Sequence, residues 1–521
     1  MGEIKGAIRN QFRMFCLDSE IEQDSEARVI DVFVDAMDLE QLGFNLRASN
    51  SLGRNGYSTG SLVKLYMYGY YNDIRTSRRL AKACTINLEV KWLVKETRPS
   101  YKTISEFRRV NAEGFSQIFD YLMSFVRNQG FFKKETTIAV DGTRLHGQNS
   151  KLKNFNEEKL NQLISRAEKQ IEQYLQELDQ ADQMDAQFQG NSIDQTDSIN
   201  TNLVDKNQKL NKLKENLANN KELLKQLEQS DEDQISVTDP DARRMGRLRD
   251  GSIVGYNGQI ATTKDSKLIV ATDVRNKPDT NTLASMSEQA QQNLGKEKLN
   301  VLADCGFSES EQLYQCSQAG LTTFVPAKPA PYEKSKGEFA KSKFIYDEEK
   351  DCYICPNNKK LQTNEKWYIR KDKARKQTRF KEYIMRNNGC VECPFRQKCQ
   401  TAKSIQNNKQ RNIRRYEHEQ YKVDSDKRAK ENPEYYKNRK AIVEHPFGTF
   451  KRSMHFTYFL LKGLEKVKAE FKLICSCYNI KRLINIMGID ELIDALKAHF
   501  IYTFSILVVT MTMGYGRSRN C

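Results

Sequence analysis

Apolar side chains recur at helical spacing through the first part of the chain. One stripe runs between Gly60 and Thr85, and another follows Ser105. The apolar positions are Leu62, Leu65, Tyr66, Gly69, Tyr70, Ile74, Leu80, Phe107, Val110, Phe115, Ile118, Leu122 and Phe125. A repeat of about 3.6 residues predicts amphipathic helices. We therefore expect an N-terminal helical domain over residues 1–130.

Short β-branched runs follow this domain. One begins at Glu135 and ends in Asp141-Gly142, a pattern typical of a buried strand with an acid at its end. Similar runs cover residues 252–263, 267–274, 298–307 and 322–329. With the intervening helices they predict a mixed α/β sheet. We assign its parts to residues 131–152 and 234–335, and a C-terminal helical part to residues 421–490.

Between the two strand-rich parts, apolar residues step by three and four. The positions are Leu160, Ile164, Ala167, Ile171, Tyr174, Leu178, Leu210, Leu213, Leu217, Leu224 and Leu227. A polar segment from Asp182 to Asn202 divides this seam. Heptad spacing predicts helices that pack along a coiled-coil seam. We expect an inserted antiparallel coiled-coil hairpin over residues 153–233, acting as a structural arm or an oligomerisation element.

The chain shows no convincing membrane segment. Its start lacks the apolar run of a secretory signal. The stretch Phe500–Met513 is shorter than the ~20 residues that span a bilayer. We therefore expect a C-terminal tail over residues 491–521, no membrane partner and a cytoplasmic location.

The charge distribution favours a polyanionic partner. The 521 residues carry a net charge of +16, and residues 341–420 contain 21 Lys and Arg against 10 Asp and Glu. Further basic residues lie among the predicted N-terminal helices: Arg75, Arg78, Arg79, Lys82, Arg108 and Arg109. These helices are compatible with a solvated basic face or with phosphate contacts to DNA, and both interpretations remain open.

Five of the 12 cysteines lie within the basic region. Cys352, Cys355, Cys390, Cys393 and Cys399 form one C-x2-C group and one C-x2-C-x5-C group. Tetrahedral zinc needs four such ligands, so five cysteines compete for four places. We interpret residues 336–420 as a small zinc-ribbon-like module that presents the basic run 371–379 to DNA. Reduced structural cysteines and an iron–sulfur cluster are the alternatives.

Three acidic residues occupy positions that suit a catalytic metal site. Asp141 and Asp304 end predicted strands, and Glu444 lies in a predicted helix beside basic residues. Carboxylates in such places can hold two divalent cations, which activate a water or a 3′-hydroxyl and stabilise the leaving oxygen. Mg²⁺ prefers oxygen ligands of this kind. Asp273 also ends a strand and is a rival for the second position.

For two further residues, Asp239 and His445, we expect roles other than catalysis. Asp239 precedes Pro240 and is expected to be structural, for example as a cap. His445 adjoins Glu444 but has no Cys or His at ligand spacing, so packing or phosphate contact is its expected role.

Several stretches of the sequence resemble the DDE transposases of bacterial insertion sequences. The likeness is to the Y-R-E-K group, in the branch with an internal coiled-coil insertion and a Cys-rich segment. The stretches are Ile138-AVDGTRL, Thr238-DPDARRM, Gly255-YNGQIA, Val301-LADCGFSE, Tyr353-ICPNNKKL, Cys390-VECPFRQKC and Ile442-VEHPFGTFKRS. The N-terminal segment with Lys102-TISEFRR is also similar to this family.

The resemblance implies a ribonuclease-H-like catalytic core in which three acids bind two Mg²⁺ or Mn²⁺ ions. These acids are Asp141, Asp304 and Glu444. The remaining signature residues, implied to contact DNA, are Tyr436, Arg439 and Lys451, with one residue more between Arg439 and Glu444 than the signature has. Because the family usually keeps the distal cysteines, the implied zinc ligands are Cys355, Cys390, Cys393 and Cys399, with Cys352 as the spare.

The function implied is transposition of an insertion sequence. The enzyme would cleave DNA strands at the element ends and join the freed 3′-hydroxyl to target DNA. Terminal repeats would be bound through the N-terminal helices by Arg78, Arg79, Arg108 and Arg109, in a homodimer that holds two ends. A ribonuclease-H-like nuclease without strand transfer and a decayed DNA-binding or repressor protein are the alternatives. The location expected is the bacterial cytoplasm, in association with the nucleoid.

Overall fold

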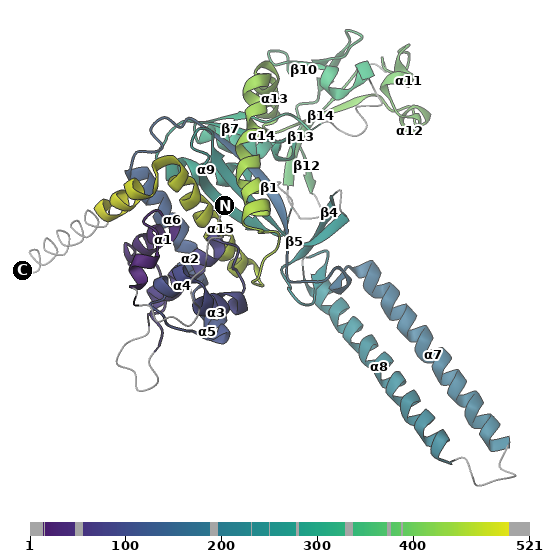
Figure 1. The fold of residues 1–521 in the computed structure, drawn as a ribbon. Helices are drawn as coiled ribbons and strands as arrows, with labels where there is room; N and C mark the ends of the chain where they lie inside the picture. The colour runs from purple at the N-terminus through teal and green to yellow at the C-terminus, as the bar shows by residue number, and fades with distance from the viewer. Residues whose placement is uncertain are drawn as a thin grey trace, which may run out of the picture.

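The structure of the protein is a computed structural model that describes most of the chain. The described residues are 14, 16–46, 56–187, 196–230, 232–248, 251–277, 281–328, 337–371, 377–386 and 389–499. Figure 1 shows N-terminal helices beside a central sheet, two long helices that project from it, and a smaller β-rich part. None of the helices in these ranges has the length and apolarity needed to cross a bilayer. The stretch 500–513 lies outside the described residues.

The central sheet has six strands of mixed direction, which confirms the predicted mixed α/β sheet. Its order is β4-β5-β1-β7-β8, and β6 pairs with β5 beside β4. Strands β1, β7 and β8 are parallel, whereas β5 is antiparallel to β1 and β6. The bounds are β1 Thr137–His146, β4 Arg243–Leu248, β5 Gly251–Thr263, β6 Ile269–Arg275, β7 Leu299–Ala303 and β8 Leu321–Phe324. Strand β1 continues beyond Asp141, where the sequence predicted its end, because β5 pairs along its whole length.

Side chains cover the outer backbone of β6. Asn479 of α15 (Leu464–Met487) accepts from the N–H of Ile269 at 2.9 Å and donates to its carbonyl at 2.8 Å. Asn293 of α9 (Leu283–Leu294) donates to the carbonyl of Val270 at 2.8 Å. Amide side chains therefore take the place of a neighbouring strand at these positions.

Helix α13 (Glu419–Glu431) covers the opposite edge of the sheet at β8. Arg428 Nε donates to the carbonyl of Thr323 at 2.9 Å. The hydroxyl of Ser425 accepts from the N–H of Val325 at 2.9 Å. The β6 and β8 edges of the sheet are thus bound by side chains from helices packed beside them.

The N-terminal helices and the sheet share one hydrophobic core. The helices are α1 Glu26–Asp35, α2 Thr59–Tyr71, α3 Ser77–Ile86, α4 Leu88–Leu93, α5 Tyr101–Val110 and α6 Ala112–Asn128, after a short 3-10 turn at Leu17–Glu20. Ser25, Ser58, Thr76, Asn87 and Ser100 each cap a helix through the side chain. Such caps satisfy N–H groups of the first turn, which explains where the helices begin. Leu65 and Phe119 belong to the same core cluster as Val140 and Phe471.

Buried polar contacts also join the N-terminal helices to α15. Tyr70 of α2 donates to Glu470 of α15 at 2.8 Å, and Arg108 of α5 donates to Tyr70 at 3.0 Å. Glu470 also accepts from the N–H groups of Leu460 and Leu461, with 2.9 Å to each at the closest. Glu470 is 2% exposed and Arg108 is 8% exposed, so this network lies inside the protein.

The two projecting helices are α7 (Glu157–Gln187) and α8 (Thr196–Gln229). They lie side by side in Figure 1, and Lys221 Nζ is 2.8 Å from Glu168 Oε1 across them. A two-stranded sheet closes their base, with β2 at Asn154–Phe155 and β3 at Ile235–Ser236. The helices extend further into the predicted polar turn than expected, because that segment lacks proline and has only one glycine to interrupt a helix.

The β-rich part contains a second six-stranded sheet, which the sequence analysis did not predict. Its order is β12-β13-β11-β10-β9, with β14 also on β13. The bounds are β9 Ile345–Asp347, β10 Cys352–Ile354, β11 Lys360–Thr363, β12 Tyr368–Lys371, β13 Gln377–Ile384 and β14 Asn412–Tyr416, with short helices α11 Arg396–Cys399 and α12 Ala402–Gln406. A small core of Phe344, Tyr353, Leu361, Tyr383 and Ile413 supports it.

The remaining helices complete the central part. They are α10 Ser310–Gln318, α14 Pro433–Gly448 and a further helix over 489–499, with short turns at Lys151–Lys153, Cys305–Phe307, Gly337–Phe339 and Lys341–Lys343 and a π-turn, η6, at Thr449–Ser453. Ile442 and Val443 of α14 pack against Ala139 of β1 and Leu302 of β7. Helix α14 therefore lies directly on the two central parallel strands.

Candidate active site at the ends of two parallel strands

Asp141 and Asp304 occupy equivalent positions on neighbouring parallel strands. Val140 of β1 pairs with Ala303 of β7, and each aspartate is the next residue along its strand. Equivalent positions on adjacent strands lie about 5 Å apart across the sheet. The fold thus brings two of the three predicted acids to one edge.

Each of these aspartates is held by local contacts. Asp141 Oδ1 accepts from the N–H of Gly142 at 2.8 Å, and Asp304 Oδ1 accepts from the N–H of Gly306 at 2.6 Å. The second contact caps the short turn that follows β7. Both carboxylates are consequently fixed in direction by the backbone next to them.

Helix α14 places two signature residues against these strand ends. Arg439 Nη1 is 3.1 Å from Asp141 Oδ2, and the two side chains are only 13% and 25% exposed. Tyr436 Oη donates to the carbonyl of Ala303 at 3.1 Å. Burial raises the pKa of Tyr436; nearby Arg439 opposes this effect and Asp304 adds to it. Tyr436 and Arg439 are therefore gathered with both aspartates.

Among the described residues, no hydrogen bond or ion pair joins Glu444 or Lys451 to these four residues. Glu444 lies on α14 and Lys451 on η6, and both are exposed. In the described part of the chain, the side chain of Glu444 makes no hydrogen bond or ion pair. Nor do the described ranges contain a group of three or more His, Cys, Asp or Glu placed to hold a metal ion. The oxygen donors of Asp141 and Asp304 nevertheless fit the chemistry of a hard cation such as Mg²⁺.

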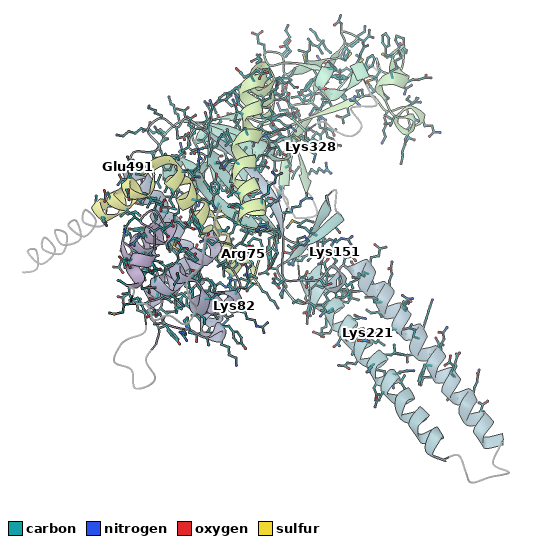
Figure 2. The ribbon with its side chains drawn as sticks, viewed as in Figure 1. Arg75, Lys82, Lys151, Lys221, Lys328 and Glu491 are labelled. Atoms are coloured by element: carbon teal, nitrogen blue, oxygen red, sulfur yellow. The ribbon has the colours of Figure 1, made fainter. Side chains whose placement is uncertain are left out.

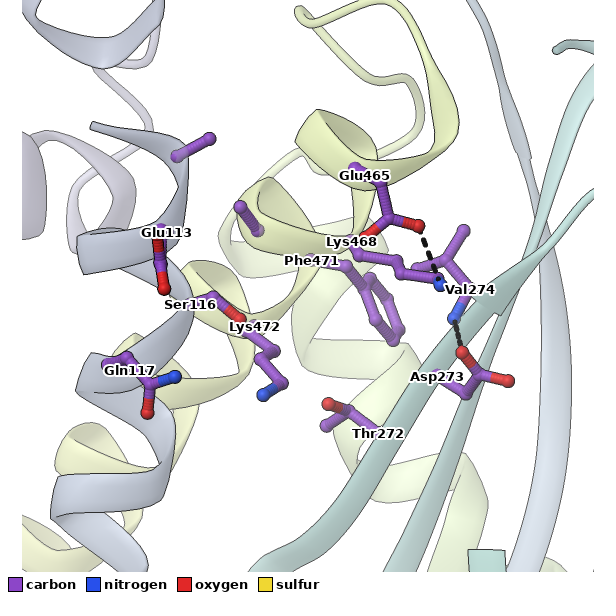
Figure 3. A pocket seen from close by; sticks show the side chains of 12 residues that line it. Glu113, Ser116, Gln117, Thr272, Asp273, Val274, Glu465, Lys468, Phe471 and Lys472 are labelled. Carbon is purple, nitrogen blue, oxygen red and sulfur yellow. Dashed lines mark hydrogen bonds and ion pairs between the residues drawn. The ribbon is translucent and has the colours of Figure 1, made fainter. Parts of the chain in front are cut away.

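The rival acid Asp273 lies away from this edge. It is on β6, where its carboxylate accepts from the N–H of Val274 at 2.8 Å and from Arg275 Nε at 2.7 Å. It lines a cavity of about 500 Å³ between α6, α15 and β6, shown in Figure 3. In this cavity Lys468 pairs with Glu465 at 2.9 Å. The cavity is thus separate from Asp141 and Asp304.

Asp239 and His445, for which the sequence predicted no catalytic role, make structural contacts. Asp239 is fully buried and accepts from Tyr256 Oη at 2.8 Å and from the N–H of Gly463 at 3.0 Å, next to the start of α15. His445 Nδ1 lies 2.8 Å from Tyr478 Oη, whose own proton goes to the carbonyl of Lys267 at 2.8 Å. These contacts fix α14 and α15 around the sheet.

The basic residues of the N-terminal helices differ in exposure. Arg78 and Arg79 are exposed on α3, and Arg109 is exposed on α5 and pairs with Glu106. Figure 2 shows Lys82 on the outside of these helices and Arg75 near the sheet. Arg75 is 3% exposed. A cavity of about 540 Å³ lies where α3 and α5 begin, lined by Thr76, Ser77, Arg78, Tyr101, Lys102, Ser105 and Glu106.

Arg108 is the exception among the predicted phosphate contacts. It is buried and bound to Tyr70, within 5.4 Å of the Tyr66 ring. Burial alone would lower the pKa of Arg108, but Tyr70, Tyr66 and Glu470 outweigh it and raise the pKa above its ordinary value. Its charge is thus balanced inside the fold. The sequence signal was its place beside Phe107 in the apolar stripe of α5.

Four of the five clustered cysteines lie close enough together to affect thiol pKa values within the group. Burial raises the pKa of Cys390 and Cys399, and nearby Cys355 and Cys393 raise it further. Cys352 is absent from this group and is 3% exposed within β10. All five are free thiols. The four thiols have the donor chemistry of a zinc site, although the described residues contain no group assembled to hold one.

Two family models match parts of the chain. Residues 354–484, which contain α14 and most of α15, match a model described as a transposase DDE domain. Residues 15–110, which contain α1 to α5, match a model described as a transposase domain (DUF772). A comparison with curated proteins finds no match.

Both matched models describe domains of transposases, a class of enzymes that cut and join DNA. More specifically, they support a DDE-type transposase of the insertion-sequence kind. A DDE domain implies the use of divalent metal ions, and a transposase implies binding to DNA.

Proposed function

We propose that this chain cleaves DNA at the ends of an insertion sequence and joins the freed 3′-hydroxyl to target DNA. The observation that carries the proposal is the pairing of Val140 with Ala303, which sets Asp141 and Asp304 side by side. Helix α14, which bears Glu444, packs on the same two strands. The transposase matches support the same activity.

We assign the central sheet to the ribonuclease-H-like class. The order β6-β5-β1-β7-β8, in which β5 runs antiparallel to the other four strands, supports this assignment. Acids at the ends of the central strands and on a covering helix are the arrangement that the class requires. Asp273 is set aside as a catalytic acid, because it lies on β6 and lines a cavity that contains neither Asp141 nor Asp304.

Asp141, Asp304 and Glu444 would hold the Mg²⁺ or Mn²⁺ ions. The metals supply Lewis-acid activation of water and of the 3′-hydroxyl. The two aspartates are held by backbone N–H groups, which fixes their direction. Glu444, whose side chain is exposed, would turn toward them to complete the site.

The DNA surface that we propose combines residues from two regions. Arg78, Arg79 and Arg109 would contact phosphates at the N-terminal helices, where their side chains are exposed. Lys451 and Arg439 would contact phosphates near the cleavage point. Arg108 is left out, because its guanidinium is buried and bound to Tyr70.

The pair of long helices is proposed as an antiparallel coiled coil that joins two copies of the chain. Leu160, Ala167, Leu210 and Leu227 are buried along the seam. Residues 157–229 carry nine Lys and Arg against 14 Asp and Glu, in a chain whose net charge is +16. An arm with excess negative charge suits contact with protein better than contact with DNA. A homodimer would hold the two element ends.

The Cys-rich part is proposed to bind zinc through Cys355, Cys390, Cys393 and Cys399. Their mutual effect on thiol pKa, without Cys352, supports this ligand set. The metal would stabilise a module whose own core is small.

The test is cleavage and joining of a labelled duplex that carries the DNA flanking this gene. Mg²⁺ is compared with Ca²⁺, and Asp304→Asn is compared with Asp273→Asn as the matched control. We expect nicking at one end and joining to target DNA with Mg²⁺, loss of both in Asp304→Asn, and activity in Asp273→Asn.

Other outcomes refute the proposal in distinct ways. Cleavage without joining identifies a ribonuclease-H-like nuclease. Binding without cleavage under any divalent metal identifies a decayed DNA-binding or repressor protein. Equal activity of the two variants shows that Asp304 is not the second carboxylate.

A further inference from the structure

The guanidinium of Arg439 contacts one carboxylate oxygen of Asp141 in β1. Arg439 Nη1 lies 3.1 Å from Asp141 Oδ2, whose other oxygen accepts from the N–H of Gly142. Only 13% of the Arg439 side chain is exposed. The pair is thus largely withdrawn from water. Salt screens an ion pair in such a place only weakly.

The same helix holds Arg439 in this place. Tyr436 lies one turn earlier and is tied to the carbonyl of Ala303. Ile442 and Val443, one turn later, are buried against the central strands. Packing on both sides therefore fixes the helix that carries Arg439, whereas the guanidinium itself is held by Asp141.

We propose that Arg439 is an exchangeable counter-ion that couples metal binding to DNA binding. In the protein without DNA, it neutralises Asp141 and opposes a divalent cation that needs the same carboxylate. A DNA phosphate is a strong ligand for a guanidinium and draws Arg439 away from Asp141. The aspartate then becomes available to metal when substrate is present.

This inference rests on the proposed function and adds a regulation of the same site. An opposite charge in contact with a carboxylate lowers the proton affinity of that carboxylate about tenfold or more. We expect it to lower the affinity of the carboxylate for a metal cation by a similar factor. By linkage, DNA must raise the metal affinity by the same factor by which metal raises the DNA affinity.

The experiment measures Mn²⁺ binding to the full chain by the electron paramagnetic resonance of free Mn²⁺. Arg439→Gln removes the counter-ion. Lys437→Gln is the matched control, since Lys437 lies on the same helix and pairs at the surface with Glu434. Without DNA, we expect about tenfold tighter Mn²⁺ binding in Arg439→Gln and no change in Lys437→Gln.

A second measurement uses the unmodified protein and depends on no variant. Addition of the flanking duplex should tighten Mn²⁺ binding about tenfold, after correction for Mn²⁺ held by the duplex alone. In Arg439→Gln the duplex should have little further effect. Unchanged or weaker Mn²⁺ binding in Arg439→Gln, or no effect of DNA on the unmodified protein, overturns the proposal.

Asp141→Asn separates this failure from that of the proposed function. If Asp141→Asn lowers Mn²⁺ affinity while Arg439→Gln leaves it unchanged, the metal site stands and the counter-ion role is wrong. If Asp141→Asn has no effect on Mn²⁺ binding, the metal site itself is wrong and the counter-ion role falls with it.

Discussion

Replacement of Glu470 by alanine should destabilise the protein more than most single substitutions. The carboxylate is 2% exposed and serves Tyr70 and the N–H groups of Leu460 and Leu461. It also favours the buried charge of Arg108, to which it is linked through Tyr70. Loss of one partner from a buried charge pair costs about 3–5 kcal/mol. The orphaned N–H groups add to this, so we expect a loss of about 4 kcal/mol or more.

The chain offers a selective assay for this loss. It has two tryptophans, Trp92 in α4 and Trp367 next to β12. In a Trp367→Phe background, urea unfolding followed by fluorescence reports the N-terminal helices through Trp92. The midpoint and slope of this transition give the change in unfolding free energy.

Three variants make the reasoning refutable. Glu470→Gln keeps the shape and one acceptor, so we expect a smaller loss of about 2 kcal/mol. Arg108→Met combined with Glu470→Met should lose less than the sum of the two single changes, because no unpaired charge remains. Glu465→Ala, at an 84% exposed side chain of the same helix, should change stability by less than about 0.5 kcal/mol. A loss below about 1 kcal/mol in Glu470→Ala would show that water or rearrangement replaces the carboxylate.

Three further changes have defined outcomes. Gly258→Ala would put a Cβ 2.8 Å from the Phe471 ring and should lower the free energy of urea unfolding by about 1–3 kcal/mol. Gly246→Ala is the control, because the space around this glycine is open, and it should cause no such loss. Zinc content measured by mass spectrometry should fall in Cys355→Ser and persist in Cys352→Ser; equal zinc in both would contradict the ligand set. Burial lowers the pKa of His499, so the folded state binds its proton less readily than the unfolded state. Stability from this site is present above the unfolded pKa of about 6.5 and is lost as pH falls through it, and His499→Phe should reduce this loss in thermal unfolding measured from pH 8 to pH 5.

The sequence predicted the central strands well because their signals are local. The run after Glu135 and the hairpin around residues 264–266 appear as β1, β5 and β6. The second sheet was missed because its strands are short and interrupted by charged residues, so alternation over four or more positions is rare. Its small core depends on contacts between residues far apart, such as Phe344 and Ile413.

The acids of the candidate site could be predicted from the sequence, but their positions relative to one another could not. Asp141 and Asp304 could be named from strand ends, yet only the register of β1 and β7 sets them side by side. The ion pair of Arg439 depends on how α14 lies across the sheet, which no local pattern specifies. Arg108 was assigned to the surface because a basic residue in a helix is usually exposed, and tertiary contacts with Tyr70 overrode that rule.

The covered edges of the central sheet restrict how copies of this protein can associate. Exposed strand edges commonly recruit a strand from another molecule, which leads to sheet extension or aggregation. Here Asn479 and Asn293 bind the outer backbone of β6. Arg428 binds the backbone of β8, and Ser425 binds that of Val325 directly after it. At these positions an incoming strand would have to displace side chains already anchored in packed helices. Extension of the central sheet by a strand from another copy is therefore disfavoured at β6 and β8.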